Sequence, residues 1–392
     1  MKDIEGHRFR LDVPQSDLDD LAGRLKRARL PSREPEDGAP WEYGTTLAYM
    51  SEFLAYWRDA YDWRAQEAKL NRFAQYRIPV GDLAVHAIVE PGSGPDPLPL
   101  VLSHGWPGSI IEFADMIEPL AHPERFGGDA KDAFTVVVPG LPGYGWSDPP
   151  KAPISPRTVG TMWHELMREH LGFERYAAHG SDWGAAVTSW LAFDHPQDLA
   201  AIHLTLGILR KPPAAGDRPP DAEESAYFER QGARMTRELG YSTQHGTRPQ
   251  TLAFGLTDSP VGLAAWILEK FQRWSAAWGK DEPPPMRIDD LITNIMFHWL
   301  PGPAPAYWMY KYLVDGSAFI LPPGRRVEIP SHFCLFPSDV SLPAPRQHVE
   351  RSYEVASFEV APYGGHFPGL DGTEPLIESL RAAFARHRPL SR

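Results

Sequence analysis

The stretch Gly180-Ser181-Asp182-Trp183-Gly184 joins an apolar, β-like segment to a helix-forming run. A sharp strand-to-helix turn needs small residues two positions before and two positions after its apex, because the backbone there leaves no room for Cβ atoms. Gly180 and Gly184 flank Asp182 in this way. An apex at Ser181 would instead put a histidine and Trp183 at the small positions, which is sterically poor. The register therefore predicts a turn whose apex is a carboxylate.

The residue at the apex indicates the chemistry. A turn of this kind is the nucleophile elbow of the α/β-hydrolase fold, and Asp182 takes the place that serine has in esterases. An attacking carboxylate suits an electrophilic sp³ carbon, as in an epoxide or an alkyl halide. It suits an ester or an amide less well, because the anhydride formed there would be too unstable to help. We therefore expect Asp182 to be the nucleophile and Ser181 to be a bystander.

The composition argues against several classes of partner. The chain has 392 residues and a net charge of −12, which disfavours nucleic acids and anionic membrane surfaces. Cys334 is the single cysteine, so an intrachain disulfide is excluded, as fits a reducing compartment. No apolar run reaches the roughly 18 residues of a membrane span. We therefore expect a cytoplasmic protein without a membrane anchor.

Strand-like and helix-like segments alternate in the middle of the chain. Near-continuous apolar strands separated by helices favour a parallel sheet that is covered on both faces. The expected strands are residues 83–89, 98–102, 134–138, 199–206, 331–336 and 358–361. The expected helices are residues 16–28, 47–61, 109–120, 158–171 and 260–274. The last of these helices begins with Ser259 as its N-cap and with proline in its first turn.

This alternation divides the chain into four parts. Residues 1–95 read as a helical arm, and residues 96–206 read as the first part of an α/β-hydrolase core. Residues 207–326 are helical and punctuated by prolines, so they read as a cap inserted into the core. The core then resumes over residues 327–392. Caps of this sort close over an active site at the carboxyl ends of the strands.

A glycine-rich turn follows the expected strand 98–102. Its sequence is Ser103-His104-Gly105-Trp106-Pro107-Gly108-Ser109. Such a turn can aim a backbone N–H at a developing oxyanion, and Trp106 is placed to supply this donor. The N–H of Trp183, one residue past the nucleophile, is the expected second donor. Removing one such donor typically costs about 3 kcal/mol of transition-state stabilisation.

Two further strand ends carry polar residues in the order that this fold requires. Asp339 follows the expected strand 331–336, and His366 follows the last strand behind two glycines. The chain order in α/β hydrolases is nucleophile, acid and base, which matches Asp182, Asp339 and His366. Asp339 would hold the His366 imidazole in the correct tautomer, so that His366 can activate water. We expect this chemistry to need no cofactor and no metal.

Together these residues resemble the microsomal-type epoxide hydrolases, a family with juvenile-hormone members and with soluble fungal and bacterial members. The resemblance covers nearly the whole chain. Matching segments include Trp41-Glu42-Tyr43-Gly44 in the arm, His104-Gly105-Trp106-Pro107 in the core and Asp258-Ser259-Pro260-Val261-Gly262 in the cap. The resemblance implies that Asp182 attacks an epoxide carbon to form a glycol ester. Water activated by His366 then hydrolyses this ester to a vicinal diol.

The resemblance also implies that two tyrosines of the cap hydrogen-bond the epoxide oxygen. Ring opening releases an alkoxide, and a neutral phenol can donate a proton to it at neutral pH. Tyr241 carries over as the first of these tyrosines. For the second, Tyr310 gives the best register, and Tyr307 and Tyr312 remain alternatives, because the basic residue that usually precedes this tyrosine is missing.

Two other functions compete with this interpretation. A haloalkane dehalogenase also uses an aspartate nucleophile followed by tryptophan, and its leaving group is a halide. The second rival is a catalytically silent hydrolase fold that serves as a binding module, against which the intact Asp182, Asp339 and His366 argue. Aromatic residues of the cap favour an apolar or aromatic epoxide as the substrate. Detoxification or secondary metabolism is the expected setting, and a homodimer is left open.

Overall fold

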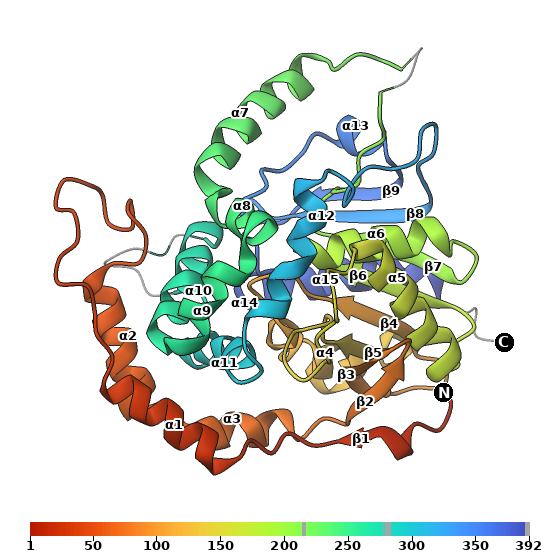
Figure 1. The fold of residues 1–392 in the computed structure, drawn as a ribbon. Coiled ribbons are helices and arrows are strands. Elements are labelled where there is room, and N and C mark those ends of the chain that lie inside the picture. The colour runs from red at the N-terminus through yellow and green to blue at the C-terminus, as the bar shows by residue number, and fades with distance from the viewer. Residues whose placement is uncertain (214–216, 277, 279–283, 389–392) are drawn as a thin grey trace.

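A mixed β-sheet forms the centre of the molecule (Figure 1). The structure is a computed structural model and describes residues 1–213, 217–276, 278 and 284–388. Within these residues the sheet has nine strands in the order β1-β2-β3-β5-β4-β6-β7-β8-β9. The strands are β1 (Arg8–Phe9), β2 (Gln75–Val80), β3 (Leu83–Glu90), β4 (Leu98–Ser103), β5 (Phe134–Pro139), β6 (Tyr176–Gly180), β7 (Leu199–Leu204), β8 (Val327–Leu335) and β9 (Tyr353–Val360).

The strands from β5 to β9 form the parallel part of the sheet. β4 pairs with β5 and β6, and the parallel pairing continues through β7 and β8 to β9. The apolar residues of β5 are fully buried, as expected for strands that are covered on both faces. Because parallel strands all end at the same edge, the segments after β4, β6, β8 and β9 lie close together, and they carry the predicted site residues.

The sheet is not parallel throughout, contrary to the prediction. β1, β2 and β3 pair antiparallel with one another, and β3 pairs antiparallel with β5. For β2 and β3 the reason is the two-residue connection 81–82, which is long enough only for a hairpin. Gly81 supplies the positive φ, +56°, that such a tight turn favours. Residues 75–90 therefore belong to the sheet although they lie within the predicted arm, and the four-part division itself stays a prediction.

The core helices agree with the sequence in part. α5 (Pro156–Glu165) continues as a π-helical turn over Leu166–His170 and packs beside α6 (Asp182–Asp194) (Figure 1). The prediction of one helix over residues 109–120 is wrong, because a 3₁₀ turn (Ile110–Phe113) precedes a short α4 (Ile117–Ala121). The Glu112 carbonyl lies against the backbone of Gly369, where a Cβ would be 2.1 Å from it. The remaining core helices are α13 (Arg346–Val349), α14 (Pro368–Asp371) and α15 (Thr373–Phe384).

Helices between β7 and β8 cover the carboxyl edge of the sheet. They are α7 (Ala222–Glu238), α8 (Gly240–Thr247), α9 (Pro249–Asp258), α10 (Pro260–Trp274), α11 (Ile288–Trp299) and α12 (Lys311–Val314). α10 has the predicted bounds, and the Ser259 side chain accepts a hydrogen bond from the Gly262 N–H at 2.9 Å, as an N-cap should. The prediction of this helix from its cap and proline is therefore confirmed.

The N-terminal helices run along the outside of the core and reach the cap (Figure 1). They are α1 (Gln15–Lys26), α2 (Leu47–Asp59) and α3 (Trp63–Leu70), and the first two agree with the predicted helices 16–28 and 47–61. The Tyr56 hydroxyl donates to Asp289 Oδ1 at 2.8 Å, and the Arg24 guanidinium pairs with Asp258. These contacts tie the arm to helices α9 and α11 of the cap.

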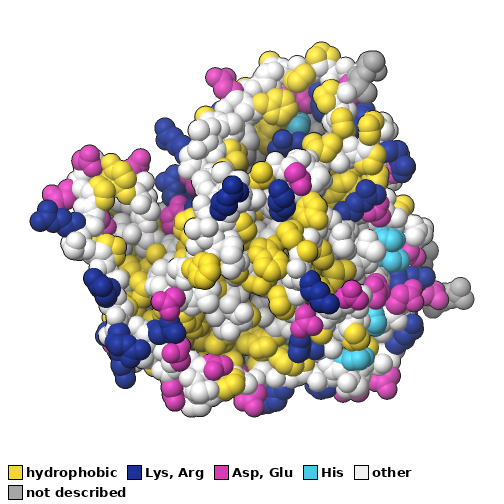
Figure 2. Space-filling view, in the orientation of Figure 1, with side chains coloured by type: hydrophobic (Ala, Val, Ile, Leu, Met, Phe, Trp, Pro, Cys, Tyr) yellow, Lys and Arg dark blue, Asp and Glu magenta, His cyan; other side chains and the backbone are white. Residues whose placement is uncertain are grey.

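The distribution of charged side chains and the apolarity of the helices agree with what the sequence predicts. Acidic and basic side chains are interspersed over the face in Figure 2, so the excess negative charge does not gather in one patch there. No single helix in the described part of the chain is long and apolar enough to cross a membrane. Among the described helices, one bent pair, α9 and α10 at 117°, meets these criteria together, by length and composition alone.

Candidate active site

Asp182 lies at the apex of the turn after β6. Its φ of +48° is in the left-handed region, which residues other than glycine rarely adopt. Close backbone approach explains the flanking glycines. A Cβ on Gly180 would lie 2.1 Å from the Gly184 carbonyl oxygen, and a Cβ on Gly184 would lie 1.9 Å from the Ser103 carbonyl oxygen. The turn therefore projects the Asp182 carboxylate at the carboxyl edge of the sheet.

The turn after β4 binds one oxygen of this carboxylate. The Trp106 N–H donates to Asp182 Oδ1 at 2.8 Å. Gly105 makes room for this contact, because a Cβ there would lie 2.1 Å from the same oxygen. The Trp106 indole stacks on Tyr241 with ring centroids 4.8 Å apart, which joins the turn to the cap. The N–H of Trp183 as the second donor stays a prediction.

His366 connects the two aspartates. Its Nδ1 lies 2.9 Å from Asp339 Oδ1, and its Nε2 lies 3.4 Å from Asp182 Oδ2. The Ser341 N–H also donates to Asp339 Oδ1 at 2.8 Å, which fixes this carboxylate behind the imidazole. Burial alone would lower the pKa of His366, but the carboxylates of Asp339 and Asp182 outweigh it and hold the pKa well above its ordinary value.

Tyr241 and Tyr310 line the same cavity as Asp182. Their ring centroids are 5.7 Å apart, and Tyr310 also packs edge-on against Trp183 at 4.9 Å. Both side chains are buried, and desolvation raises the pKa of each phenol, so both hydroxyls stay protonated at neutral pH. The two rings therefore present neutral O–H groups in the region of the Asp182 carboxylate.

The two alternative tyrosines have different surroundings. Tyr307 stacks on His245 with ring centroids 4.0 Å apart and does not line the cavity of Asp182. Tyr312 lines this cavity, but its hydroxyl donates to the Pro153 carbonyl at 3.2 Å. Of the three candidates, Tyr310 is thus the one that packs against both Tyr241 and Trp183.

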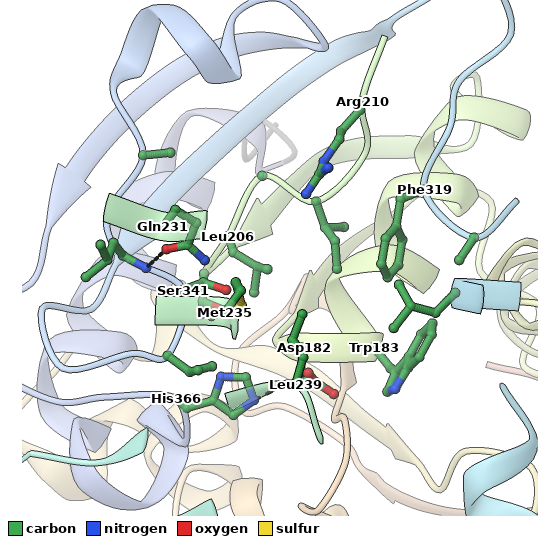
Figure 3. Close-up of a pocket in the computed structure, with 18 of the residues that line it drawn as sticks. Asp182, Trp183, Leu206, Arg210, Gln231, Met235, Leu239, Phe319, Ser341 and His366 are labelled. Atoms are coloured by element: carbon green, nitrogen blue, oxygen red, sulfur yellow. Dashed lines mark hydrogen bonds and ion pairs between the residues drawn. The ribbon is translucent and has the colours of Figure 1, made fainter. Parts of the chain in front are cut away.

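A cavity of about 350 Å³ contains these groups. Asp182, Tyr241, Tyr310 and His366 are among its lining residues. Apolar side chains form much of its wall, and Figure 3 shows some of them around Asp182: Leu206, Met235, Leu239 and Phe319. The cavity therefore offers an apolar space that ends at a carboxylate, an imidazole and two phenols.

Two buried carboxyl groups near the site were missed in the sequence. The Ser181 hydroxyl donates to Glu112 Oε1 at 3.2 Å, and burial raises the pKa of Glu112 to about 8. Burial likewise raises the pKa of Asp371 to about 7, beside His366. The available signal was an acid within an apolar run, as in Ile110-Ile111-Glu112-Phe113. Among the described residues, no group of three or more His, Cys, Asp or Glu could hold a metal ion.

We expect Glu112→Gln to reduce the loss of stability that accompanies a rise in pH toward about 8. The folded protein keeps the Glu112 proton at pH values where the unfolded chain has released it. Between about pH 4.5 and about pH 8, the free energy of unfolding therefore falls as the pH rises. An amide has nearly the same shape and cannot ionise. Thermal unfolding of both proteins across this range measures the effect, and parallel curves would contradict a raised pKa.

Two protein families match the chain. Residues 6–113 match the family described as Epoxide hydrolase N terminus, and residues 99–277 match the alpha/beta hydrolase fold. The two matches overlap at the turn after β4, which contains Trp106. The first match begins in the arm and includes β1 to β4, which agrees with the pairing of the arm's strands with the core sheet.

Relatives of this chain are similar over nearly their whole length. A Stigmatella aurantiaca protein, whose name assigns it provisionally to the epoxide hydrolases, is 37% identical, and the match covers 97% of this chain and 85% of the relative. Epoxide hydrolase 1 of Oryctolagus cuniculus is 31% identical, with 95% and 87% covered. The expected resemblance is thereby confirmed.

A solved structure also agrees with this fold. The epoxide hydrolase of Aspergillus niger superposes with a TM-score of 0.83 at 27% identity, over 97% of this chain and 96% of that one. Such coverage includes the arm, the core and the cap. The chain therefore belongs to the epoxide hydrolase family, a group of enzymes with the α/β-hydrolase fold.

Proposed function

We propose that this protein hydrolyses an epoxide to a vicinal diol through an ester on Asp182. The observation that carries this proposal is the unequal environment of the two Asp182 oxygens. Oδ1 accepts the Trp106 N–H, whereas Oδ2 faces His366 Nε2 at 3.4 Å. Oδ2 is thus the oxygen that attacks the epoxide carbon, and Oδ1 becomes the ester carbonyl oxygen in the oxyanion site.

The bonds and protons of the two steps balance. In the first step, Oδ2 bonds to an epoxide carbon, the carbon–oxygen bond of the ring breaks, and a phenol proton neutralises the alkoxide. Before the second step, the proton of His366 restores the phenol. The neutral His366 then takes a proton from water, and the hydroxide attacks Cγ of Asp182. The bond between Cγ and Oδ2 breaks, the new carboxyl group gives its proton to the departing oxygen, and the diol leaves with Oδ2. Water supplies the new oxygen of the carboxylate.

This origin of the oxygen gives the test of the proposal. With enzyme in excess over an epoxide in ¹⁸O-water, we expect the diol of the first turnover to be mainly unlabelled. The label should then appear in Asp182, in the peptide recovered after proteolysis. Mass spectrometry of diol and peptide measures both. Fully labelled diol in the first turnover would mean direct attack by water and would exclude the ester.

We expect Tyr241→Phe and Tyr310→Phe each to slow ester formation by about 10²-fold, the lower end of what general acid catalysis contributes. Each change removes only a hydroxyl and keeps the ring packing. Tyr307→Phe is the matched control, because it removes an equally buried hydroxyl outside the cavity. Rapid-quench measurement of ester formation compares the three. Equal rates of ester formation in all three variants and the wild type would exclude Tyr241 and Tyr310 as the acids of the first step.

The acid groups favour an epoxide over an alkyl halide. A halide leaves without a proton, whereas an alkoxide needs one, and Tyr241 and Tyr310 are neutral donors beside the nucleophile. The apolar wall supports an apolar or aromatic substituent on the epoxide. Halide release from alkyl halides without turnover of any epoxide would favour the dehalogenase instead. A protein that binds epoxides without turning them over would be a binding module.

A further inference from the structure

The cavity has a second polar region besides the nucleophile and the phenols. Arg210, Tyr227, Gln231 and Ser341 line it together with the apolar wall. In Figure 3 the Arg210 side chain points from the segment after β7 toward the cavity, and Asp182 and His366 lie below it in the view. A cation therefore faces a largely apolar space that has the Asp182 carboxylate at its far end.

The backbone around Arg210 is held in place. Its N–H donates to the Phe319 carbonyl at 2.7 Å, and its own carbonyl accepts from the Leu321 N–H at 3.0 Å. These bonds form an isolated bridge between Arg210 and Ile320. The guanidinium thus extends from a fixed point where the core passes into the cap.

The Arg210 guanidinium differs from the basic groups that follow it in the chain. Lys211 pairs with Asp217 at 2.8 Å, and Arg218 pairs with Asp221 at 3.1 Å. No hydrogen bond or ion pair of the Arg210 side chain is found in the described part of the chain, although acidic residues outnumber basic ones by 51 to 39. The position is therefore open to an anion from outside the protein.

We propose that Arg210 binds the carboxylate of a substrate whose epoxide lies at Asp182 and whose apolar chain fills the space between them. This inference rests on the proposed function, because it assigns the substrate class of the same cavity: epoxides that carry an acid group. The guanidinium forms bidentate hydrogen bonds with a carboxylate. The negative charges of Asp182 and Asp339 disfavour a substrate carboxylate near the nucleophile. The substrate is therefore oriented with its epoxide at Asp182 and its carboxylate at Arg210.

Gln231 supports the same assignment. Its Oε1 accepts the Leu342 N–H at 2.9 Å, as the dashed line in Figure 3 shows, which fixes the amide. The amide nitrogen of Gln231 can then donate only, and it lines the same cavity. Arg210 and Gln231 thus present donors toward this end of the cavity, and an acceptor-only group such as a carboxylate suits them.

The experiment compares ω-epoxy alkanoic acids of increasing chain length with their methyl esters. Each pair keeps the epoxide and the chain and differs in the charge. For the wild type, we expect kcat/KM to favour the acid by about tenfold or more at the best chain length, the effect of one charged hydrogen bond. The preference should shrink as salt is added. Equal values for acid and ester at every length would overturn the proposal.

Variants of Arg210 test whether this residue causes the preference for the acid over the methyl ester. Arg210→Gln should lose the preference for the acid, because it lowers kcat/KM for the acid by about tenfold more than for the methyl ester, and Arg210→Lys should keep part of the preference. Arg218→Gln is the matched control, because its side chain already pairs with acids. A preference for the acid that survives in Arg210→Gln would assign the anion to another group and would overturn the proposal.

A binding measurement separates this inference from the proposed function. Calorimetric titration with the diol acid and with its methyl ester needs no turnover. Tighter binding of the acid that is lost in Arg210→Gln supports the inference, even if no epoxide is hydrolysed and the proposed function fails. Hydrolysis of both substrates without any difference in binding between acid and ester overturns the inference and leaves the proposed function intact.

Discussion

In Asp182→Asn we expect diol formation to fall by at least about 10⁴-fold, as is usual when a catalytic nucleophile is removed. The amide cannot attack an epoxide carbon. Its oxygen can still accept the Trp106 N–H, which Asp182 Oδ1 accepts at 2.8 Å. Asparagine also tolerates the left-handed backbone at this position better than alanine would. Diol formation under saturating enzyme measures the loss, and intact mass checks that the amide has not hydrolysed.

Ser181→Ala is the control for this result, because Ser181 is the neighbouring nucleophile that an esterase would use. Its hydroxyl donates to Glu112 at 3.2 Å, behind the turn. We expect this variant to retain turnover within about tenfold of the wild type, because the loss of one neutral hydrogen bond changes a rate by about that factor or less. Loss of a general acid or base would lower the rate by more than this. Loss of activity in Ser181→Ala with normal turnover in Asp182→Asn would show that Ser181, and not Asp182, is the nucleophile.

In His366→Gln we expect the ester on Asp182 to accumulate and kcat to fall by about 10²- to 10⁴-fold, the range of general base catalysis. Ester formation should continue, because the nucleophile and the two phenols are unchanged. The intact mass of the protein should rise by the mass of the epoxide within one turnover. An unmodified protein with normal turnover would contradict the assignment of His366 as the base.

The state of His366 should change between the two steps. In the free enzyme, the charges of Asp182 and Asp339 hold the pKa of His366 above its ordinary value. Ester formation removes the charge of Asp182, so the pKa of His366 must fall. The imidazole then loses its proton more readily and becomes a base. The rate of ester hydrolysis should therefore rise with pH and level off once His366 of the ester has lost its proton. This plateau should begin at a lower pH than the pH at which His366 of the free enzyme titrates.

The turn at Asp182 could be predicted because its information is local. Backbone crowding requires small residues at Gly180 and Gly184, and this requirement can be read from five consecutive letters. The same holds for α10, where Ser259 and Pro260 mark the start of the helix. The 3₁₀ turn at Ile110–Phe113 was not predicted. The backbone of this turn packs against Gly369, which lies more than 250 residues later in the chain, so the local sequence does not contain this contact.

Contacts between distant segments also decided the details of the site. The register alone left Tyr307, Tyr310 and Tyr312 as alternatives, and the packing of Tyr310 against Tyr241 and Trp183 distinguishes them in the structure. The apolar neighbours of Glu112 hint at its burial, but its place beside the site, like that of Asp371, cannot be read from the sequence. Burial, which raises the pKa of both, exists only after the chain has folded.

The sequence by itself predicted Asp182 as the attacking group and the order of Asp182, Asp339 and His366, and it determined the family. Each of these depends on the types and spacing of neighbouring residues, which backbone sterics and chain order constrain. Only the tertiary structure decided which oxygen of Asp182 is held by Trp106 and which faces His366, and which groups share the cavity, Arg210 among them. These depend on distances between residues far apart in the chain, which the folded sheet and its cap create.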